Sequence, residues 1–285
     1  MRPDLRCGIC TFKWTYERAL LEGAEAASFA VSLASLIEQR LEADLNLGVL
    51  NTEAVKKAYE FVNFTSPYFS PFKRSSNENA KALLHEARAY IEAAKEERGL
   101  IERAVKVACA SNVSPVTGPR CPYSFEETMR IVKGEKGVRV AGEILSAILQ
   151  ARSILYLPDN AGEIAFDGLL IDALTRMGKE VHVFVKKAPF FDDATREDAE
   201  ELGIRDAVKS LHEIDGFLFP PALEGRARDV FLRSDLILSK GIGNYDAIGE
   251  EDLGRPVIHM FKVKCLPISR RTAGDLGELR IIMEG

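Results

Sequence analysis

The chain has 285 residues and a formal net charge of −5, with 46% hydrophobic and 28% charged residues. This composition predicts a soluble globular protein of one large or two smaller domains, and the acidic balance excludes broad nucleic-acid binding. No apolar run is long enough to cross a membrane, and residues 1–10 lack the apolar core of a signal peptide. We therefore expect a cytoplasmic protein that does not act on membranes.

Helical periodicity dominates the chain before residue 150. The segments with this pattern are residues 15–44, 52–62, 78–109 with a break at Gly99, the stretch after Ser124, and 138–150. Thr52 is expected to cap the second segment, and Ser124-x-x-Glu127 has the form of a capping box. Pro67 and Pro71 predict a loop between the second and third segments. We therefore predict an all-helical domain over residues 1–148.

Strands and helices alternate after residue 150. The apolar runs that predict strands are Ser153–Leu157, Val181–Lys186, Asp235–Ser239 and Val257–Val263, and helical patterns follow them at about 163–177, 195–203, 225–232 and 267–273. Such alternation implies parallel strands joined by right-handed crossovers. We therefore predict an α/β domain over residues 149–285 with a doubly wound, mostly parallel, Rossmann-like sheet, on which the helical part packs.

Two oxygen-bearing side chains, Asp159 and Asn160, follow the first predicted strand directly after Pro158. Gly162 and Glu163 then open the next helical segment. Ligands of open α/β sheets bind at the carboxyl ends of strands, and hard oxygen ligands there suit Mg²⁺ or Mn²⁺. The alternative is that Asp159 or Asn160 only caps the following helix.

A second acidic position follows the next predicted strand. Asp193 could complete a metal site with Asp159 and Asn160, and Asp192 is a rival ligand of nearly equal standing. The alternative for Asp193 is an N-cap, because the residues after it have the composition of a helix start.

The third predicted strand leads into Lys240-Gly241-Ile242-Gly243-Asn244. An ammonium group beside two glycines and a helix start suits a phosphate. The run is not a dinucleotide fingerprint, because Asp246 stands where the third glycine would be, and it lacks the P-loop pattern. The alternative is that the glycines only form a tight turn.

Five cysteines, an odd number, make a disulfide framework unexpected in a reducing compartment. Cys7-x-x-Cys10 has the spacing of metal ligands, and Cys265, just past the fourth strand, is the best third partner. These thiols would form a second site for a soft metal such as zinc or iron. The alternative is ordinary packing, which we expect for Cys109 and Cys121.

In their order and spacing these motifs resemble the damage-control phosphatase family, also called domain of unknown function 89. The resemblance rests on Asp159-Asn160-x-Gly-Glu163, Asp193-Ala-Thr and Lys240-Gly-x-Gly-Asn244-Tyr, each after a strand. It covers nearly the whole chain. The helical N-terminal half, Ala110-Ser111-Asn112, the Cys-x-x-Cys pair and Lys264-Cys265 resemble the archaeal and bacterial branch.

The resemblance implies a phosphatase of small phosphorylated metabolites that depends on a divalent cation such as Mg²⁺, Mn²⁺, Co²⁺ or Ni²⁺. It implies that Asp159, Asn160 and Asp193 hold the cation and that Lys240 and Asn112 lie near the phosphate. Glu163, Gly241, Gly243 and Asn244 are expected to line the substrate site. Many relatives carry an aspartate three residues after the position of Asn112, where this chain has Pro115.

We expect direct attack by a water molecule, because metal coordination would occupy Asp159. Lys240 would offset charge on the phosphate oxygens, so Lys240→Ala should lower kcat/KM with little effect on folding.

One alternative is an S-adenosylmethionine-dependent methyltransferase, since a eukaryotic branch of the family was proposed to methylate protein carboxyl groups. Such enzymes usually place a glycine-rich turn after the first strand. A non-catalytic metal- or nucleotide-binding module is the other alternative, and the oligomeric state is left open.

Overall fold

The structure, a computed structural model, describes residues 2–24, 26–42, 45–63, 67–112, 128, 130 and 138–285. The helices before the sheet are α1 (Leu5–Leu21), α2 (Ala26–Glu42), α3 (Leu47–Tyr59), α4 (Phe69–Glu92), α5 (Glu97–Ala110) and α7 (Gly142–Gln150). Pro115, Cys121 and the pattern from Ser124 to Glu127 lie outside the described residues.

The rest of the chain forms a six-stranded sheet with helices between the strands. The strands are β1 (Ser153–Leu157), β2 (Glu180–Lys186), β3 (Ser210–Ile214), β4 (Leu236–Lys240), β5 (Val257–Lys262) and β6 (Leu279–Glu284). The helices are α8 (Glu163–Arg176), α9 (Arg196–Glu201), α10 (Ile204–Ala207), α11 (Gly225–Arg233), α12 (Gly241–Ile248) and α13 (Leu266–Thr272), with a 3₁₀ turn at Pro220–Ala222. The strand order is β3-β2-β1-β4-β5-β6, and only β6 is antiparallel to its neighbour. The predicted mostly parallel α/β fold is confirmed.

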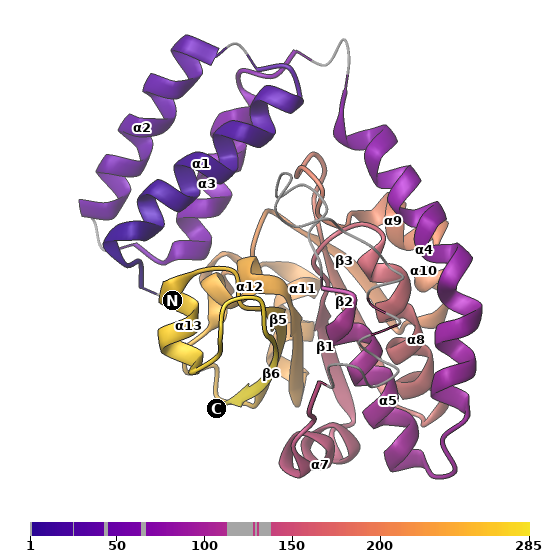
Figure 1. The fold of residues 1–285 in the computed structure, drawn as a ribbon. Coiled ribbons are helices and arrows are strands. Elements are labelled where there is room, and N and C mark those ends of the chain that lie inside the picture. Colours follow the sequence, from indigo (N-terminus) through magenta and orange to yellow (C-terminus); the bar gives the residue numbers. More distant parts are fainter. Residues whose placement is uncertain are drawn as a thin grey trace.

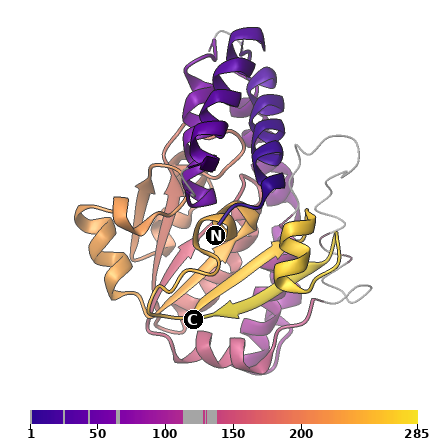
Figure 2. The ribbon, with the colours of Figure 1, turned by 90° about the vertical axis from the view of Figure 1, so that its left-hand side faces the viewer.

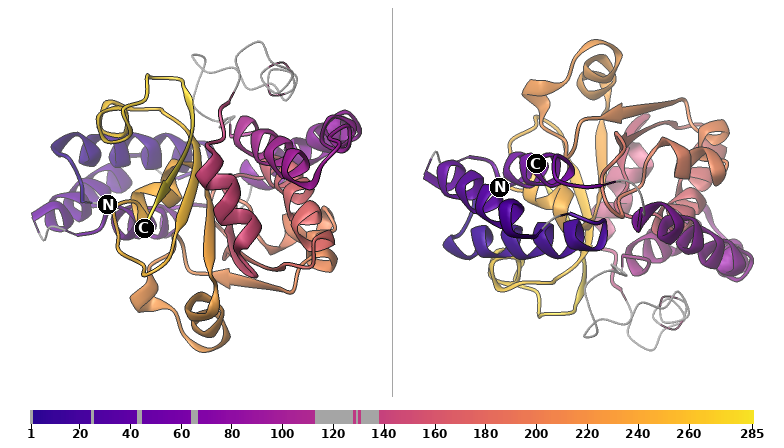
Figure 3. Two further views of the ribbon diagram at one scale, coloured as in Figure 1. Left: turned by 90° about the horizontal axis from the view of Figure 1, so that it is seen from below. Right: turned by 90° about the horizontal axis from the view of Figure 1, so that it is seen from above.

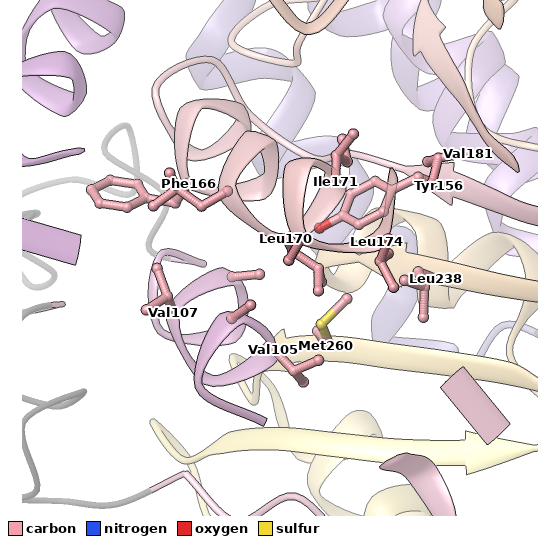
Figure 4. Close-up of a cluster of buried hydrophobic side chains, with 14 of the residues drawn as sticks. Val105, Val107, Tyr156, Phe166, Leu170, Ile171, Leu174, Val181, Leu238 and Met260 are labelled. Atoms are coloured by element: carbon pink, nitrogen blue, oxygen red, sulfur yellow. The ribbon is translucent and has the colours of Figure 1, made fainter. Parts of the chain in front are cut away.

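Helices cover both faces of the sheet, as the two views of Figure 3 show. Successive residues of β1 enter different cores, because strand side chains alternate between faces. Tyr156 packs with α5 and α8 on one face, whereas Leu155 and Leu157 join the core on the other face with α12. Figure 4 shows Tyr156 close to Leu170 and Leu174 of α8. β1 is therefore buried on both faces, which explains its apolar run in the sequence.

Helices α1, α2 and α3 project as a bundle beyond the sheet (Figures 1 and 2). The bundle is joined to α12 through α3. Asn46 caps α3 through its side-chain oxygen, and its Nδ2 donates to the carbonyl of Ala247 at 2.8 Å. A Cβ on Gly48 would lie 2.3 Å from Cβ of Ala247, so glycine permits the close approach of the two helices. The bundle is thereby held near the strand ends.

Several predicted boundaries in the helical part are wrong. The stretch 15–44 is not one helix, because the chain turns at Gly23 with φ +90° between α1 and α2. Thr52 lies inside α3 and its hydroxyl donates to the carbonyl of Gly48, so it is not the cap. Pro71 lies in the first turn of α4, and Gly99 lies inside α5. Proline is tolerated in a first helical turn, where its missing N–H costs nothing.

Two strands, β3 and β6, are absent from the sequence prediction. Both lie at sheet edges. Only Leu211 and Ile214 of β3 are buried, and all residues of β6 are part-exposed. Neither therefore gives the continuous apolar run of a central strand. Helix α5 packs on the sheet and α4 packs on α5 and α8, whereas α1–α3 stand beyond the sheet. The domain division at residue 148 stays a prediction.

Candidate metal and phosphate site

The strand order reverses direction between β1 and β4, which are neighbours at the centre of the sheet. A crevice forms at such a switch point, outside the carboxyl ends of the strands. Asp159 and Asn160 follow β1 at this point, and Lys240 ends β4 where α12 begins. The fold therefore brings the first and third sequence motifs to the same edge.

The loops after β1 and β2 pair with each other as a short antiparallel bridge between Asn160 and Asp193. The amide of Ala161 donates to the carbonyl of Asp192 at 2.9 Å, and that of Ala194 donates to the carbonyl of Asp159 at 2.8 Å. Residues opposite each other in such a pair place their side chains on the same side. The side chains of Asn160 and Asp193 are thus neighbours.

Asp159 completes this group of three. The Nδ2 of Asn160 donates to Asp159 Oδ2 at 3.1 Å and to Glu163 Oε1 at 2.8 Å. The amide nitrogen is thereby occupied, which leaves the side-chain oxygen of Asn160 available to a cation. Asp193 Oδ2 is buried and has no hydrogen-bond partner in the structure. Two carboxylates and one amide oxygen fit a hard divalent cation, and one carboxylate oxygen among them accepts no hydrogen bond.

Asp192, the rival ligand, is engaged elsewhere. Its Oδ1 accepts from Nε of Arg18 at 3.1 Å, and both side chains are buried. Its Oδ2 has no hydrogen-bond partner in the structure, but the guanidinium already neutralises the carboxylate. Asp193 is therefore the better candidate for a cation ligand.

Asp193 is not the cap of α9. The N-cap is Thr195, which forms a capping box with Asp198: the Thr195 amide donates to Asp198 Oδ2 at 2.8 Å. The capping alternative for Asp193 is thereby removed. Burial raises the pKa of Asp193 well above its ordinary value, and Lys186, whose Nζ lies 4.0 Å away, opposes that rise.

Gly241 lies directly beneath the carboxylate of Asp159. Its φ is +78°, and a Cβ there would lie 2.0 Å from Asp159 Oδ2. The first turn of α12 begins at this glycine, and its N-cap, Lys240, makes no side-chain capping bond. Amides of a first helical turn need an acceptor from outside the helix, and an anion can supply it. The first turn of α12 therefore suits a phosphate next to Asp159.

Gly243 and Asn244 have packing roles in the structure. A Cβ on Gly243 would lie 2.4 Å from Cε1 of Phe217, so the glycine makes room for this ring. Asn244 is fully buried, and its Nδ2 donates to the carbonyls of Pro158 at 3.0 Å and Lys240 at 2.8 Å. Its Oδ1 accepts from Lys186 Nζ at 3.0 Å. Asn244 thus joins the ends of β1, β2 and β4.

Lys240 lies beneath the site and is fully buried. Its Nζ donates to Asp167 Oδ1 at 2.8 Å and to Ser111 Oγ at 3.2 Å, and it lies 3.6 Å from Glu163 Oε2. The nearby carboxylates outweigh burial and raise the pKa of Lys240. The side chain is therefore a charged link between α8, α5 and the end of β4.

Asn112 and Glu163 connect this buried lysine to the predicted ligands. Nδ2 of Asn112 donates to Asp159 Oδ2 and to Glu163 Oε2, both at 2.8 Å, and its Oδ1 accepts from the amide of Lys262 at 3.0 Å. Burial raises the pKa of Glu163 to about 7, although Lys240 opposes the rise. Asn112 thus fixes the Asp159 carboxylate from the end of α5.

The ionisable groups around the ligands carry an unbalanced charge. The buried carboxylates are Asp159, Glu163, Asp167 and Asp193, and the buried ammonium groups are Lys186 and Lys240. When all six are ionised, the cluster carries two more negative than positive charges. An uncompensated charge inside a protein is costly, and a divalent cation would balance this one.

Two members of this cluster have no role in the sequence prediction. Asp167 lies one helical turn after Glu163 on α8, so the i, i+4 spacing is the signal that could have found it. Lys186 ends β2 and shares the strand-end position of the other motifs. Its Nζ also lies 4.5 Å from the centre of the Phe217 ring.

The three cysteines of the predicted soft-metal site differ in their burial. Cys7 is buried in the first turn of α1, where its Sγ accepts from the amide of Asp4 at 3.3 Å; Cys10 is exposed and Cys265 is part-buried. Across the part of the chain that the structure describes, no group of three or more His, Cys, Asp or Glu side chains is arranged to hold an ion. A soft-metal site stays a prediction, to be tested by comparing the zinc and iron contents of the wild type and a Cys7→Ser, Cys10→Ser variant.

A pocket of about 180 Å³ lies between the helical part and the loop after β2. Its lining includes Tyr59, Phe69, Lys73 and Phe191. Lys73 also donates to Thr195 Oγ1 at 3.0 Å. The boundary between the helical part and the sheet is thus hollowed beside the loop that carries Asp193.

Comparison with known families identifies the family of this chain. The family of the damage-control phosphatase ARMT1-like domain matches residues 7–279. The chain belongs to this family. The match includes every predicted ligand at the strand ends, together with the helical bundle.

Relatives from archaea are similar over different shares of the chain. An uncharacterized protein of Methanocaldococcus jannaschii is 33% identical over 45% of this chain and 43% of its own length. A damage-control phosphatase of Pyrococcus horikoshii is 28% identical over 62% of this chain and 63% of its own length. A damage-control phosphatase of Archaeoglobus fulgidus is 27% identical over 81% of this chain and 80% of its own length. The matches thus span less than two thirds of the first two relatives.

A solved structure supports the fold. The crystal structure of a DUF89 family protein from Pyrococcus horikoshii has a TM-score of 0.80 with 23% identity, covering 98% of both chains. None of the described helices combines the length and apolar character needed to cross a membrane.

Proposed function

We propose that this protein is a metal-dependent phosphatase that hydrolyses phosphomonoesters of small metabolites. The observation that carries the proposal is the pairing of Asn160 with Asp193 beside Asp159, at the switch point of the sheet. The phosphatase names of two relatives support it. The methyltransferase alternative is not favoured, because the relatives are named phosphatases and the turn after β1 holds acidic and amide side chains.

Asp159, Asn160 and Asp193 would hold the divalent cation. The Asp193 oxygen that accepts no hydrogen bond and the excess of carboxylates over ammonium groups in the buried cluster both support this assignment. A bound cation would polarise the phosphate and lower the pKa of a water molecule. We propose that water attacks directly, with Asp159 kept as a ligand rather than as a nucleophile.

The start of α12 would bind the phosphate, and the residues around Asp159 would hold the predicted ligands in place. The amides at the start of α12, next to Gly241, would donate to its oxygens. Asn112 would orient the Asp159 carboxylate through its 2.8 Å hydrogen bond. Glu163 holds both asparagines in place, and Lys240 would offset negative charge from below. The direct substrate contacts of Asn112, Glu163, Lys240, Gly243 and Asn244 stay predictions.

We propose a cytoplasmic enzyme whose partner is a small phosphorylated metabolite, with Mg²⁺, Mn²⁺, Co²⁺ or Ni²⁺ as its cofactor. The test is a panel of phosphorylated metabolites, assayed with each cation in turn and with EDTA. Asp159→Ala should abolish cation-dependent release of phosphate. Asp215→Ala is the matched control, because Asp215 is an exposed aspartate with 69% of its side chain accessible.

Each outcome of the panel identifies one function. Phosphate release that needs a cation and Asp159 supports the phosphatase. Cation binding without turnover on any phosphorylated metabolite would support the non-catalytic module. Methyl transfer from labelled S-adenosylmethionine, without phosphate release, would overturn the proposal.

A further inference from the structure

The loop that carries Asp193 contains a residue in an unusual backbone conformation. Phe191 has φ +43°, which bulky side chains rarely adopt and which persists only where the surroundings fix it. Three rings from the N-terminal helices surround it: Trp14 at 5.6 Å, Tyr59 at 5.2 Å and Phe69 at 5.3 Å between ring centres. The hydroxyl of Tyr59 also accepts from the amide of Phe191 at 3.0 Å.

The next residue, Asp192, is held from the same side. Its carboxylate accepts from Nε of Arg18 at 3.1 Å, and the guanidinium of Arg18 lies 4.9 Å from the centre of the Trp14 ring. Both charged side chains are buried, with 4% and 2% of their surface exposed. A buried pair of this kind fixes its partners strongly, because breaking it leaves an uncompensated charge.

These contacts come from three separate helices and converge on the two residues before Asp193. Trp14 and Arg18 lie on α1, Tyr59 ends α3 and Phe69 begins α4. On its other side, the loop is fixed by the bridge between Asn160 and Asp193. The backbone at Asp193 is therefore held between the helical part and the end of β1.

We infer that Trp14, Arg18 and Tyr59 are positioning residues that set the affinity of the metal site by holding the Asp193 loop in its strained conformation. The inference rests on the proposed function only in taking Asp193 as a cation ligand. It assigns the helical bundle a direct effect on cation binding through Phe191 and Asp192, with no bundle residue touching the ion.

The test measures the Kd of Mn²⁺ by calorimetry on the full-length protein after removal of metal. The variant Arg18→Gln, Asp192→Asn removes the buried pair without changing the net charge. We expect its Kd to rise about tenfold or more, as for other residues that orient a metal ligand. Tyr59→Phe deletes one hydroxyl and should raise the Kd about threefold, the effect of one hydrogen bond.

The matched control is Arg40→Gln, Glu53→Gln, which removes an ion pair of the same bundle with 42% and 28% of its side chains exposed. It should leave the Kd within about twofold of the wild type, since exposed pairs contribute little. Circular dichroism confirms that each variant is folded. If the buried double variant does not fold, the Kd of Mn²⁺ is measured for Tyr59→Phe and Trp14→Phe, and a higher Kd in both supports the inference.

Four outcomes separate the hypotheses. Weaker binding in both the double variant and Tyr59→Phe supports the inference. Weaker binding in the double variant alone would mark Asp192 as a ligand and overturn it. Wild-type affinity in every folded positioning variant, while Asp193→Asn loses Mn²⁺, would overturn the inference and leave the proposed function intact. An Asp193→Asn variant that binds Mn²⁺ normally would remove both.

Discussion

Gly241 shows how a single missing side chain shapes the site. The carboxylate of Asp159 occupies the space where any other residue would place its Cβ, 2.0 Å from Oδ2. The residue also has φ +78°, which L-residues with a Cβ avoid. Gly241, which the sequence predicts to line the phosphate site, is thus a condition for the position of the predicted ligand Asp159.

We expect Gly241→Ala to lower kcat/KM on the order of 10²-fold, because displacing Asp159 by about 1 Å disrupts the alignment of the site. The measurement is steady-state kinetics with a saturating cation. Gly178→Ala is the matched control, since Gly178 has the same φ of +78° but nothing within 4 Å of the added Cβ. Both variants should lose about 1 to 2 kcal/mol from backbone strain. Equal activity in both would remove Gly241 from the site.

The structure changes the prediction for how Lys240 affects stability. The sequence predicts an ammonium group whose loss affects activity and leaves folding nearly intact. The structure places it at 0% exposure between Asp167 and Glu163. Its removal leaves buried carboxylates without their counter-charge, so stability must fall as well.

We therefore expect Lys240→Met to destabilise the protein by about 3 kcal/mol, the cost of breaking a buried ion pair. Activity should fall on the order of 10²-fold, as for the loss of one electrostatic donor. Urea unfolding and kinetics measure the two effects separately. Adding Asp167→Asn should restore part of the stability and none of the activity. An unchanged unfolding midpoint in Lys240→Met would contradict the buried arrangement.

At the scale of elements, two loops carry the site because they pair with each other. The loop after β1 and the loop before α9 form two backbone hydrogen bonds across Asn160 and Asp193. Helix α9 then begins at its own cap, Thr195, so Asp193 is not needed to start the helix. Capping is therefore assigned to Thr195, which leaves Asp193 available for the proposed cation.

Substitution of these two residues should separate the functions. We expect Thr195→Ala to lower the free energy of unfolding by about 1 kcal/mol, as for other lost N-caps. Asp193→Asn should reduce cation-dependent activity by about 10²-fold or more, and any change in the stability of the metal-free protein should come from the pairing with Lys186 rather than from a lost cap. Thermal unfolding in EDTA and phosphatase kinetics are the measurements. Cation-dependent activity that persists unchanged in Asp193→Asn would contradict its role as a ligand.

At the scale of the whole molecule, the site lies where the sheet, the helices on its face and the end of α5 meet. Carboxylates from several elements are buried together there, and the pKa of Glu163 rises to about 7 because of that burial. The folded metal-free protein therefore keeps a proton on Glu163 at pH values where the unfolded chain has lost it. Its stability must then decrease as pH rises from about 4.5 to about 7.

We expect the free energy of unfolding in EDTA to fall over this pH window, and to fall less steeply in Glu163→Gln, which has no proton to lose. The slope with pH is the readout, since the substitution also removes an acceptor from Asn112 or Asn160. Saturating Mn²⁺ should reduce the slope in the wild type, because a cation favours the ionised carboxylates. Identical slopes for both proteins in EDTA would contradict the shifted pKa.

Local patterns were sufficient to predict much of the molecule. Central strands such as β1 are buried on both faces and give apolar runs, and the run predicted at Ser153–Leu157 is confirmed to the residue. The alternation of such runs with helical periods predicts a parallel sheet, in which polar residues after successive strands share one edge. That reasoning placed Asp159, Asn160 and Lys240 at the same end of the fold.

The tertiary structure decided what one-dimensional patterns do not contain. Edge strands β3 and β6 are only partly buried, so their pairing depends on neighbours rather than on their own residues. The distinction between Asp192 and Asp193 depends on Arg18, which is 174 residues away in the chain. The partners of a buried charge are set by packing between distant segments. For this reason the sequence predicted candidate residues at the ends of the strands, whereas only the fold assigned each of them its contacts.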